Sequence, residues 1–341
     1  MMDLEEATGF VRQLYKDVLR REPKSDELAR WADLAATKLS PAAVVGAFFR
    51  SPEGRRHHDI KCAYPNGHWH SPIVDPSTVT AYVGWQQNLS PRDLPGVEID
   101  PDAMRVFWEE SADVIRSTPF TEMPVPERRF HYEGGFYPNG DAIVLRAMMA
   151  KHRPRRVVEI GSGFSTACML DCADEFGLDG FEMICIDPDA RRLRGMLRPE
   201  DEGRVTIIEQ PVQEVSLDTF TALEAGDFLF IDSTHVLKTG SDVHYELFYI
   251  LPALRDGVIV HVHDVPYPFE YCSDWIFAKN FSWNEAYALR AFLMYNAKFS
   301  VYFWGNLVSA SFPELVQATV PAGVKIIQSA VWLKKQTPGE P

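Results

Sequence analysis

The stretch Val157-Val-Glu-Ile-Gly-Ser-Gly-Phe-Ser-Thr166 decides the fold of this chain. Its apolar beginning predicts a buried strand, and its two glycines predict a tight turn into a helix that continues through Ala167-Cys-Met-Leu170. Glycines let a ligand approach the backbone closely, and the first turn of a helix offers unpaired N–H groups. We therefore predict a binding site at this turn. Its expected binding residues are Gly161, Ser162, Gly163 and Ser165.

Two acidic residues near this turn suggest the kind of ligand. Glu159 lies in an otherwise apolar strand, where a buried carboxylate needs a partner. Asp187 ends the next predicted strand, at the spacing at which an acidic side chain binds a ribose diol. Gln213 follows the third strand and is expected near an adenine ring. A dinucleotide fingerprint would place a third glycine or alanine where this chain has Thr166, which weakens the alternative of a nicotinamide-dependent oxidoreductase.

The sequence around this turn alternates between helices and short apolar strands. The expected helix at Ala142–Lys151 comes first, and such alternation predicts an α/β fold with a mostly parallel sheet covered on both faces. Ligands bind at the carboxyl ends of the strands of such sheets. The expected strands are Arg156–Ile160, Glu182–Asp187, Val205–Glu209, Phe228–Asp232, Val258–Val262, Ser300–Trp304 and Lys325–Lys334.

Four polar residues follow the fourth and fifth strands and are candidates for catalysis. Asp232 ends the fourth strand and His235 comes three residues later, so both are expected at the carboxyl edge. His235 is the first candidate for a general base, since imidazole titrates near neutral pH; a helix-capping histidine is an equal alternative. His263 and Asp264 end the fifth strand, and His263 could be a second base or a substrate contact.

The ordered set of these motifs resembles a known family. Val157–Thr166, Asp187, Phe228–His235 and Val260–Asp264 are similar to the motifs of class I S-adenosylmethionine-dependent methyltransferases, particularly the small-molecule branch called methyltransferase family 24. The resemblance covers about residues 130 to 335. It implies a Rossmann-like sheet of seven strands with an antiparallel last strand, and S-adenosylmethionine as cofactor. Glu159 would then face the positively charged methionine end of the cofactor, directly or through water.

The resemblance also raises the question of a metal ion. In catechol O-methyltransferase-like enzymes, acidic residues at the ends of the fourth and fifth strands hold Mg²⁺, which polarises the acceptor oxygen. Asp232 and Asp264 match two of these positions. Val265 stands where an amide ligand is expected, so a magnesium ion stays an open alternative.

The acceptor pocket is expected to use segments outside the sheet. Aromatic residues interleaved with Asn and His suit a polyhydroxylated or glycosylated acceptor, and the predicted reaction is O-methylation of a sugar or natural product. His68-Trp-His70 lacks an acidic companion, which favours a lid or packing role over a metal site. The alternatives are N-methylation of a small molecule, the oxidoreductase named above, and a non-catalytic scaffold. The candidate acceptor-binding residues are Tyr137, Asn139, His68, His70, Tyr267 and Trp283.

The chain divides into three expected regions. Residues 1–55 have the apolar spacing of a small helical module, and Phe10–Pro23, Leu28–Trp31 and Phe48–Glu53 resemble the DUF4214 domain. This module is expected to pack or to bind a partner, either a second copy of the chain or another protein. Residues 56–140 are expected to form a connector or lid that contributes to the acceptor pocket, and residues 141–341 the cofactor-binding domain.

Composition narrows the classes of partner. The net charge of −14 disfavours nucleic acid, and the Arg pairs at 128–129, 155–156 and 191–192 are expected to be solvated. Five cysteines, mostly in apolar runs, predict no disulfide framework and fit a reducing cytoplasm. The sequence suggests neither a signal peptide nor a membrane span.

Overall fold

The computed structural model describes residues 2–57, 63–133, 135–321 and 329–336. The chain forms two compact units, Met1–Val74 and Asp75–Pro341, and each unit has a hydrophobic core of its own. The boundary between them comes later in the chain than residue 55, where the sequence suggested the end of the helical module.

The first unit is helical. Asp3 begins the first helix with a reciprocal cap, because its side chain accepts a hydrogen bond from the Glu6 N–H at 2.8 Å and the Glu6 carboxylate accepts one from the Asp3 N–H. The ring of Tyr15 meets that of Phe48 edge-on at 4.9 Å in the core. Its helices are α1 (Leu4–Asp17), α2 (Ser25–Thr37), α3 (Pro41–Arg50) and α4 (Pro52–His57).

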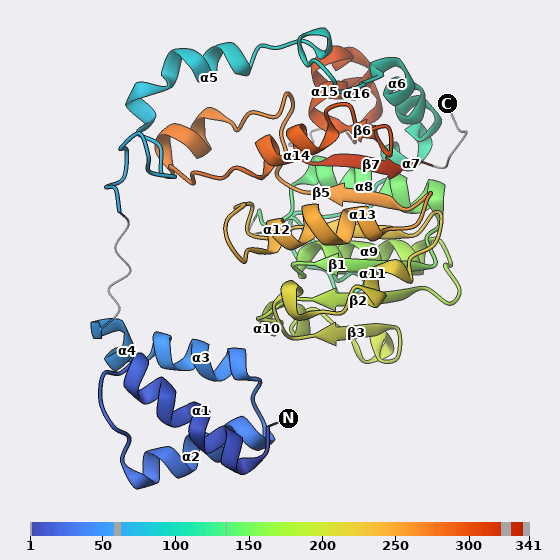
Figure 1. Cartoon of the computed structure of the whole chain (residues 1–341). Coiled ribbons are helices and arrows are strands. Elements are labelled where there is room, and N and C mark those ends of the chain that lie inside the picture. Colours follow the sequence, from blue (N-terminus) through green and yellow to red (C-terminus); the bar gives the residue numbers. More distant parts are fainter. Residues whose placement is uncertain (1, 58–62, 134, 322–328, 337–341) are drawn as a thin grey trace. The chain divides into compact units, whose positions relative to one another are not determined.

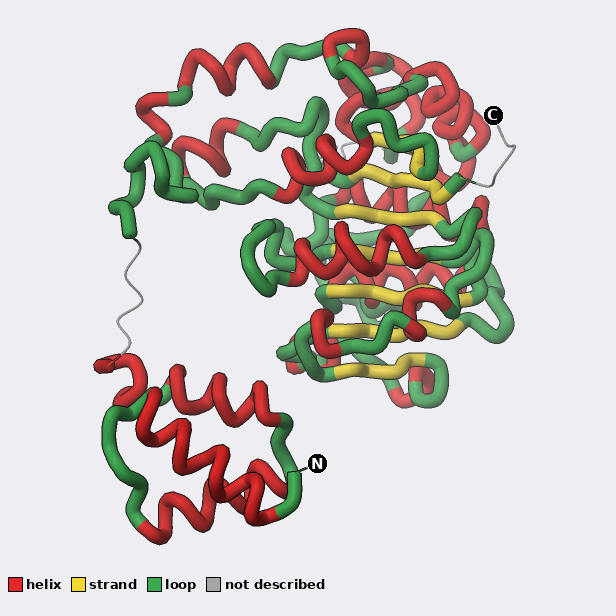
Figure 2. The backbone as a smooth tube through the Cα atoms, viewed as in Figure 1, coloured by secondary structure: helices red, strands yellow, loops and turns green. Residues whose placement is uncertain are grey.

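The second unit is built on a sheet of seven strands in the order β3-β2-β1-β4-β5-β7-β6 (Figure 2). β7 runs antiparallel to both neighbours, and the other adjacent pairs are parallel, which confirms the predicted fold class. Part of the last expected strand, residues 325–328, lies outside the described residues. The strands are β1 (Arg156–Ile160), β2 (Glu182–Ile186), β3 (Val205–Ile208), β4 (Phe228–Ile231), β5 (Ile259–Val262), β6 (Phe299–Trp304) and β7 (Val331–Lys335).

Helices cover both faces of this sheet. α8 (Asn139–His152) and α9 (Phe164–Glu175) pack on one face, and α12 (Asp242–Tyr245) and α13 (Leu251–Ala253) on the other (Figure 1). Within the described ranges, no helix has both the length and the apolarity of a membrane span. The remaining helices are α5 (Thr80–Gln86), α6 (Pro101–Glu110), α7 (Ala112–Arg116), α10 (Arg191–Arg194), α11 (Asp218–Thr221), α14 (Glu285–Leu293), α15 (Gly305–Ser311) and α16 (Pro313–Thr319).

The segment before α8 belongs to the core of the second unit. α6 and α7 lie in this segment, and Ser111 separates them. Trp108 is fully buried, and the ring of Phe107 lies 4.9 Å from that of Phe303 in β6. Because these side chains pack against the sheet, this part of the chain contributes to the hydrophobic core of the second unit.

The environment of Arg129 differs from the expectation that the arginine pair 128–129 is solvated. Its side chain is 1% exposed rather than solvated, and it forms ion pairs with Asp171 and Asp174 of α9 and with Asp201, at 2.7 to 2.9 Å. A buried guanidinium is tolerated because carboxylates surround it. This network fastens the segment before α8 to the helix that follows the glycine turn.

Candidate active site

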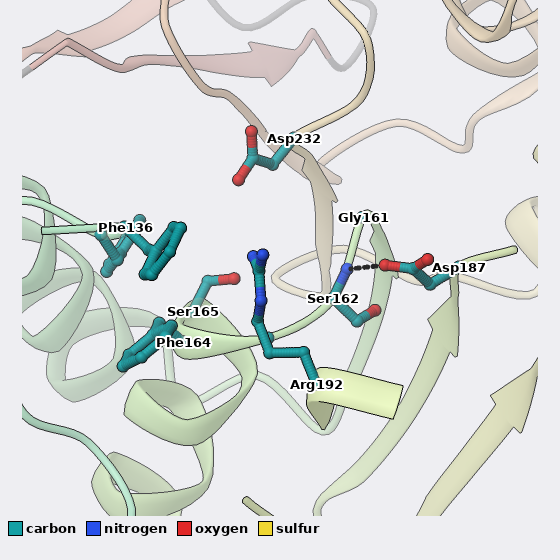
Figure 3. Close-up of a pocket in the computed structure, with 10 residues that line it drawn as sticks. Phe136, Gly161, Ser162, Phe164, Ser165, Asp187, Arg192 and Asp232 are labelled. Carbon is teal, nitrogen blue, oxygen red and sulfur yellow. Dashed lines mark hydrogen bonds between the residues drawn. The ribbon is translucent and has the colours of Figure 1, made fainter. Parts of the chain in front are cut away.

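A pocket opens at the carboxyl edge of the sheet. It lies where β1 and β4 are neighbours, at the point where the order of strands changes direction. Ligands of open α/β sheets bind at this position. Its lining residues are Phe136, Tyr137, Gly161, Ser162, Gly163, Phe164, Ser165, Asp187, Arg192 and Asp232 (Figure 3).

Gly161 makes the turn that forms the floor of the pocket. Its φ is 78°, in the left-handed region, and a Cβ at this position would lie 1.9 Å from the carbonyl oxygen of Asp232. The Gly161 N–H donates to the Ile186 carbonyl, and the Asp232 N–H donates to the Ile160 carbonyl, each at 2.9 Å. These contacts press the turn against β4, so that no side chain fits between them.

Asp187 holds the same turn from the end of β2. Its carboxylate accepts a hydrogen bond from the N–H of Ser162 at 3.0 Å (Figure 3). It accepts another from the N–H of Asp189 at 2.8 Å. The side chain is half-buried and lines the pocket. Asp187 therefore stabilises the turn and lines the pocket, and its expected contact with a ribose stays a prediction.

Glu159 lies beneath the turn and is fully buried. Its carboxylate accepts hydrogen bonds from the hydroxyl of Ser165 at 2.6 Å and from that of Thr166. Burial raises the pKa of Glu159 to about 7, although these two hydrogen bonds act in the opposite direction. The first turn of α9 thus supplies partners for this carboxylate, and its expected contact with a cofactor stays a prediction.

His235 lies next to the pocket, held between carboxylates. Its Nδ1 is 2.8 Å from Glu285 Oε2, while its Nε2 is 3.6 Å from Asp232 Oδ1 and 3.7 Å from Asp264 Oδ2. The ring of Trp283 packs at 4.5 Å. Burial acts to lower the pKa of His235, but the hydrogen bond to Glu285 and the surrounding carboxylates outweigh it and raise the pKa to about 9. The imidazole is thus fixed in orientation and strongly basic.

His263 lies deeper, behind Asp264. Its Nε2 is 3.6 Å from Asp264 Oδ1, and its ring is 5.3 Å from the ring of Tyr137. Burial lowers the pKa of His263, but the charge of Asp264 leads the opposing effects, which raise it overall. Ser329 also donates to Asp264 Oδ1 at 2.7 Å. His263 is not among the residues that line the pocket.

The two acidic residues considered for Mg²⁺ are close together but do not form a metal site. Asp232 and Asp264 both face the Nε2 of His235, so an imidazole occupies the position between their carboxylates. In the described part of the chain, no group of three or more His, Cys, Asp or Glu side chains is arranged to hold a metal ion. Mg²⁺ requires near-octahedral oxygen ligands, so we derive no catalytic step through a metal.

The other predicted residues differ in where they lie relative to the pocket. Tyr137 lines the pocket and is buried, and Asn139 is the first residue of α8. The amide of Gln213 donates to the Gly240 carbonyl at 2.8 Å, and the hydroxyl of Tyr267 donates to the Leu89 carbonyl at 2.8 Å. Neither Gln213 nor Tyr267 lines the pocket. Each side chain instead forms a hydrogen bond with the backbone of another segment.

His68 and His70 belong to the first unit. The ring of His68 stacks on that of Tyr64 at 4.6 Å, and the ring of His70 lies 5.0 Å from the same tyrosine. The two histidines thus form a local aromatic cluster with Tyr64. Their predicted role in binding an acceptor stays a prediction.

The pocket and its surroundings include residues that the sequence analysis did not select. Glu285 contacts His235 from a position 50 residues later, and no local spacing predicts such a contact. Arg192, which was interpreted as part of a solvated pair, is exposed and also lines the pocket. Phe136 and Phe164 stack at 5.5 Å and form an aromatic wall.

Comparison with known proteins gives two family matches. Residues 158–265 match the family described as "Methyltransferase domain", family 24, and residues 4–58 match DUF4214. An uncharacterised protein of Archaeoglobus fulgidus is 28% identical over 170 residues, which cover 47% of this chain and 74% of that protein.

Solved structures with similarity to the chain include two methyltransferases. An SAH-bound methyltransferase of Podospora anserina has 14% identity and a TM-score of 0.38, with 82% of this chain and all of that chain covered. A putative O-methyltransferase of Klebsiella pneumoniae has 14% identity and a TM-score of 0.41, with 71% and 92% covered.

The family matches agree with the fold and with the pocket. The seven strands, the antiparallel last strand and the glycine turn at the end of β1 are those that the resemblance to class I enzymes implies. The matched region, residues 158–265, contains that turn, Asp187, Asp232 and Asp264. Residues 158–265 of the chain therefore match a family 24 methyltransferase domain, with which the fold and the pocket agree, and residues 4–58 match a DUF4214 domain.

Proposed function

We propose that this chain is an S-adenosylmethionine-dependent methyltransferase that methylates a hydroxyl group of a small molecule, a sugar or natural product, with His235 as the general base. The observation that carries the proposal is the fixed orientation of the imidazole. Glu285 accepts a hydrogen bond from Nδ1, which leaves Nε2 as the atom able to take a proton. Nε2 faces Asp232, a residue of the pocket wall.

The pocket suits the cofactor. Gly161 leaves its backbone uncovered, Asp187 is placed for a ribose diol, and Asp232 brings negative charge to the pocket wall. S-adenosylmethionine supplies a methyl group on a positively charged sulfur. Phe136 and Phe164 add an apolar, stacked aromatic surface to the pocket lining.

The chain contributes three actions to the reaction. The pocket orients the acceptor hydroxyl toward the methyl group, His235 removes the hydroxyl proton through Nε2, and Glu285 stabilises the resulting imidazolium. Trp283 covers one side of His235 and keeps the imidazole in place.

Methyl transfer into a panel of hydroxylated small molecules, with S-adenosylhomocysteine release followed by mass spectrometry, tests the proposal. We expect a product 14 Da heavier than its acceptor, and we expect His235→Ala to abolish turnover while S-adenosylhomocysteine still binds. Unchanged turnover in His235→Ala would exclude this residue as the base. Methylation of amines alone would favour the alternative of N-methylation.

A further inference from the structure

Arg192 is the one cationic side chain among the described residues that line the pocket. It lies on α10, directly after β2 and Asp187. Figure 3 shows the side chain entering the pocket between Phe136 and Ser162, on the side that faces Asp232. Its guanidinium carbon is 4.4 Å from the centre of the Phe136 ring. The side chain is exposed, and this contact places its charge over an aromatic ring of the pocket lining.

The neighbouring arginines differ from Arg192 in their partners. Arg191 forms an ion pair with Asp189, and Arg194 forms one with Glu209 at 2.9 Å. Across the ranges that the structure describes, no ion pair joins Arg192 to a carboxylate. Its guanidinium therefore has free donors directed at the space where a ligand would lie.

Gly163 makes room for the stem of this side chain. A Cβ on Gly163 would lie 3.3 Å from the Cδ of Arg192, closer than most side-chain contacts. The backbone of Gly163 is extended, so the residue is not required there by its φ. The absence of a side chain at Gly163 thus leaves space for Arg192, whose stem passes over this residue to reach the pocket.

The charges of the pocket determine what Arg192 can bind. Asp187 and Asp232 are both acidic, so they repel an anionic group of a ligand, and Arg192 is the lining side chain whose charge attracts it. S-adenosylmethionine carries one carboxylate, on its amino-acid end. A guanidinium binds a carboxylate through two parallel hydrogen bonds, which a lysine cannot reproduce.

We propose that Arg192 binds the carboxylate of the cofactor's amino-acid end and so selects S-adenosylmethionine over nucleosides that lack this group. The proposal rests on the proposed function, since it takes S-adenosylmethionine as the methyl donor. The ion pair replaces the contact that Arg192 makes with Phe136 or adds to it.

Isothermal titration of the full chain with two ligands tests this. The first is S-adenosylhomocysteine, and the second is S-adenosyl-3-thiopropylamine, the same molecule without its carboxylate. We expect Arg192→Met to weaken S-adenosylhomocysteine binding by about 10- to 100-fold and to change binding of the amine by less than about threefold. Arg192→Lys is expected to fall between Arg192→Met and the wild type. Arg191→Met is the matched control and is expected to bind both ligands as the wild type does.

Each outcome decides the proposal. A selective loss for the carboxylate-bearing ligand supports it. An equal loss for both ligands shows that Arg192 only shapes the pocket, and no loss for either shows that it is not a ligand; both overturn it. If the wild-type chain binds neither ligand, the proposed function fails together with this inference. Thermal unfolding of each variant confirms that it is folded, and Arg192→Lys retains the test if Arg192→Met unfolds.

Discussion

Gly161 and Asp232 are in contact through their backbones, with no space for a side chain between β1 and β4. A Cβ on Gly161 would lie 1.9 Å from the Asp232 carbonyl oxygen, and the Asp232 N–H is itself bonded to Ile160. The floor of the pocket and one of its acidic walls are therefore placed by the same contact. A change at either residue is expected to move both.

Replacement of Gly161 by alanine is expected to abolish cofactor binding. The substitution adds the cost of a left-handed φ to a direct clash with backbone, together about 2–4 kcal/mol of unfolding free energy. Chemical denaturation and titration with S-adenosylhomocysteine measure the two effects. Gly180→Ala is the matched control, because Gly180 has a φ of 73° but nothing within 4 Å of an added Cβ. Equal destabilisation by both variants would contradict the clash.

Activity is expected to rise with pH up to the pKa of His235. Because that pKa is raised to about 9, the imidazole is mostly protonated at neutral pH, and only the neutral form can accept a proton. Below about pH 9, kcat/KM should increase roughly tenfold per pH unit and then level off. Glu285→Gln removes the carboxylate that supports the imidazolium, so the profile should shift to lower pH with a lower kcat. A profile flat from neutral to alkaline pH would exclude His235 as the base.

Glu159→Gln is expected to stabilise the protein at alkaline pH. The pKa of Glu159 is raised from 4.5 to about 7, so the folded state binds more protons than the unfolded state between these values. Stability is therefore lost as the pH rises from 4.5 through 7. Glutamine removes this dependence, and at about pH 8 the gain should approach about 3 kcal/mol. Unfolding at about pH 4, where the wild-type carboxyl is protonated in both states, is the control. The same difference at both pH values would contradict the explanation.

Loss of Arg129 is expected to destabilise the second unit strongly. Arg129→Met leaves the buried carboxylates of Asp171 and Asp201 without their cation, at a cost of about 3–5 kcal/mol. Arg128→Met is the neighbouring control: its 3.8 Å ion pair with Glu175 is partly exposed and should be worth less than about 1 kcal/mol. Urea denaturation of both variants measures the difference, and similar midpoints would contradict the role of the network.

Local patterns predicted most of the second unit. Strands β1 to β6 begin and end close to the expected positions, because each is an apolar run bounded by turn residues. The glycine turn with Asp187 and Asp232 was also predicted, since each of these residues follows directly after a strand. Strand ends of a parallel sheet meet at one edge, so local sequence is enough to group them.

The contacts that sequence analysis missed join distant parts of the chain. Glu285 in α14 contacts His235, which lies 50 residues earlier, and Arg129 pairs with Asp201, which lies 72 residues later. The sequence next to each of these residues does not identify its partner. Arg192 was missed for another reason. A pair of arginines on a short helix is usually solvated, and only the direction of the side chain distinguishes Arg192 from Arg191.

The two hydrophobic cores share no residue, and one consists of side chains before Val74, the other of side chains after it. Mutations inside the helical module should therefore change the unfolding temperature of that module without changing the affinity of the second unit for the methyl donor. The same separation means that the module can be exchanged for an unrelated one by recombination between genes, while the catalytic part keeps its chemistry.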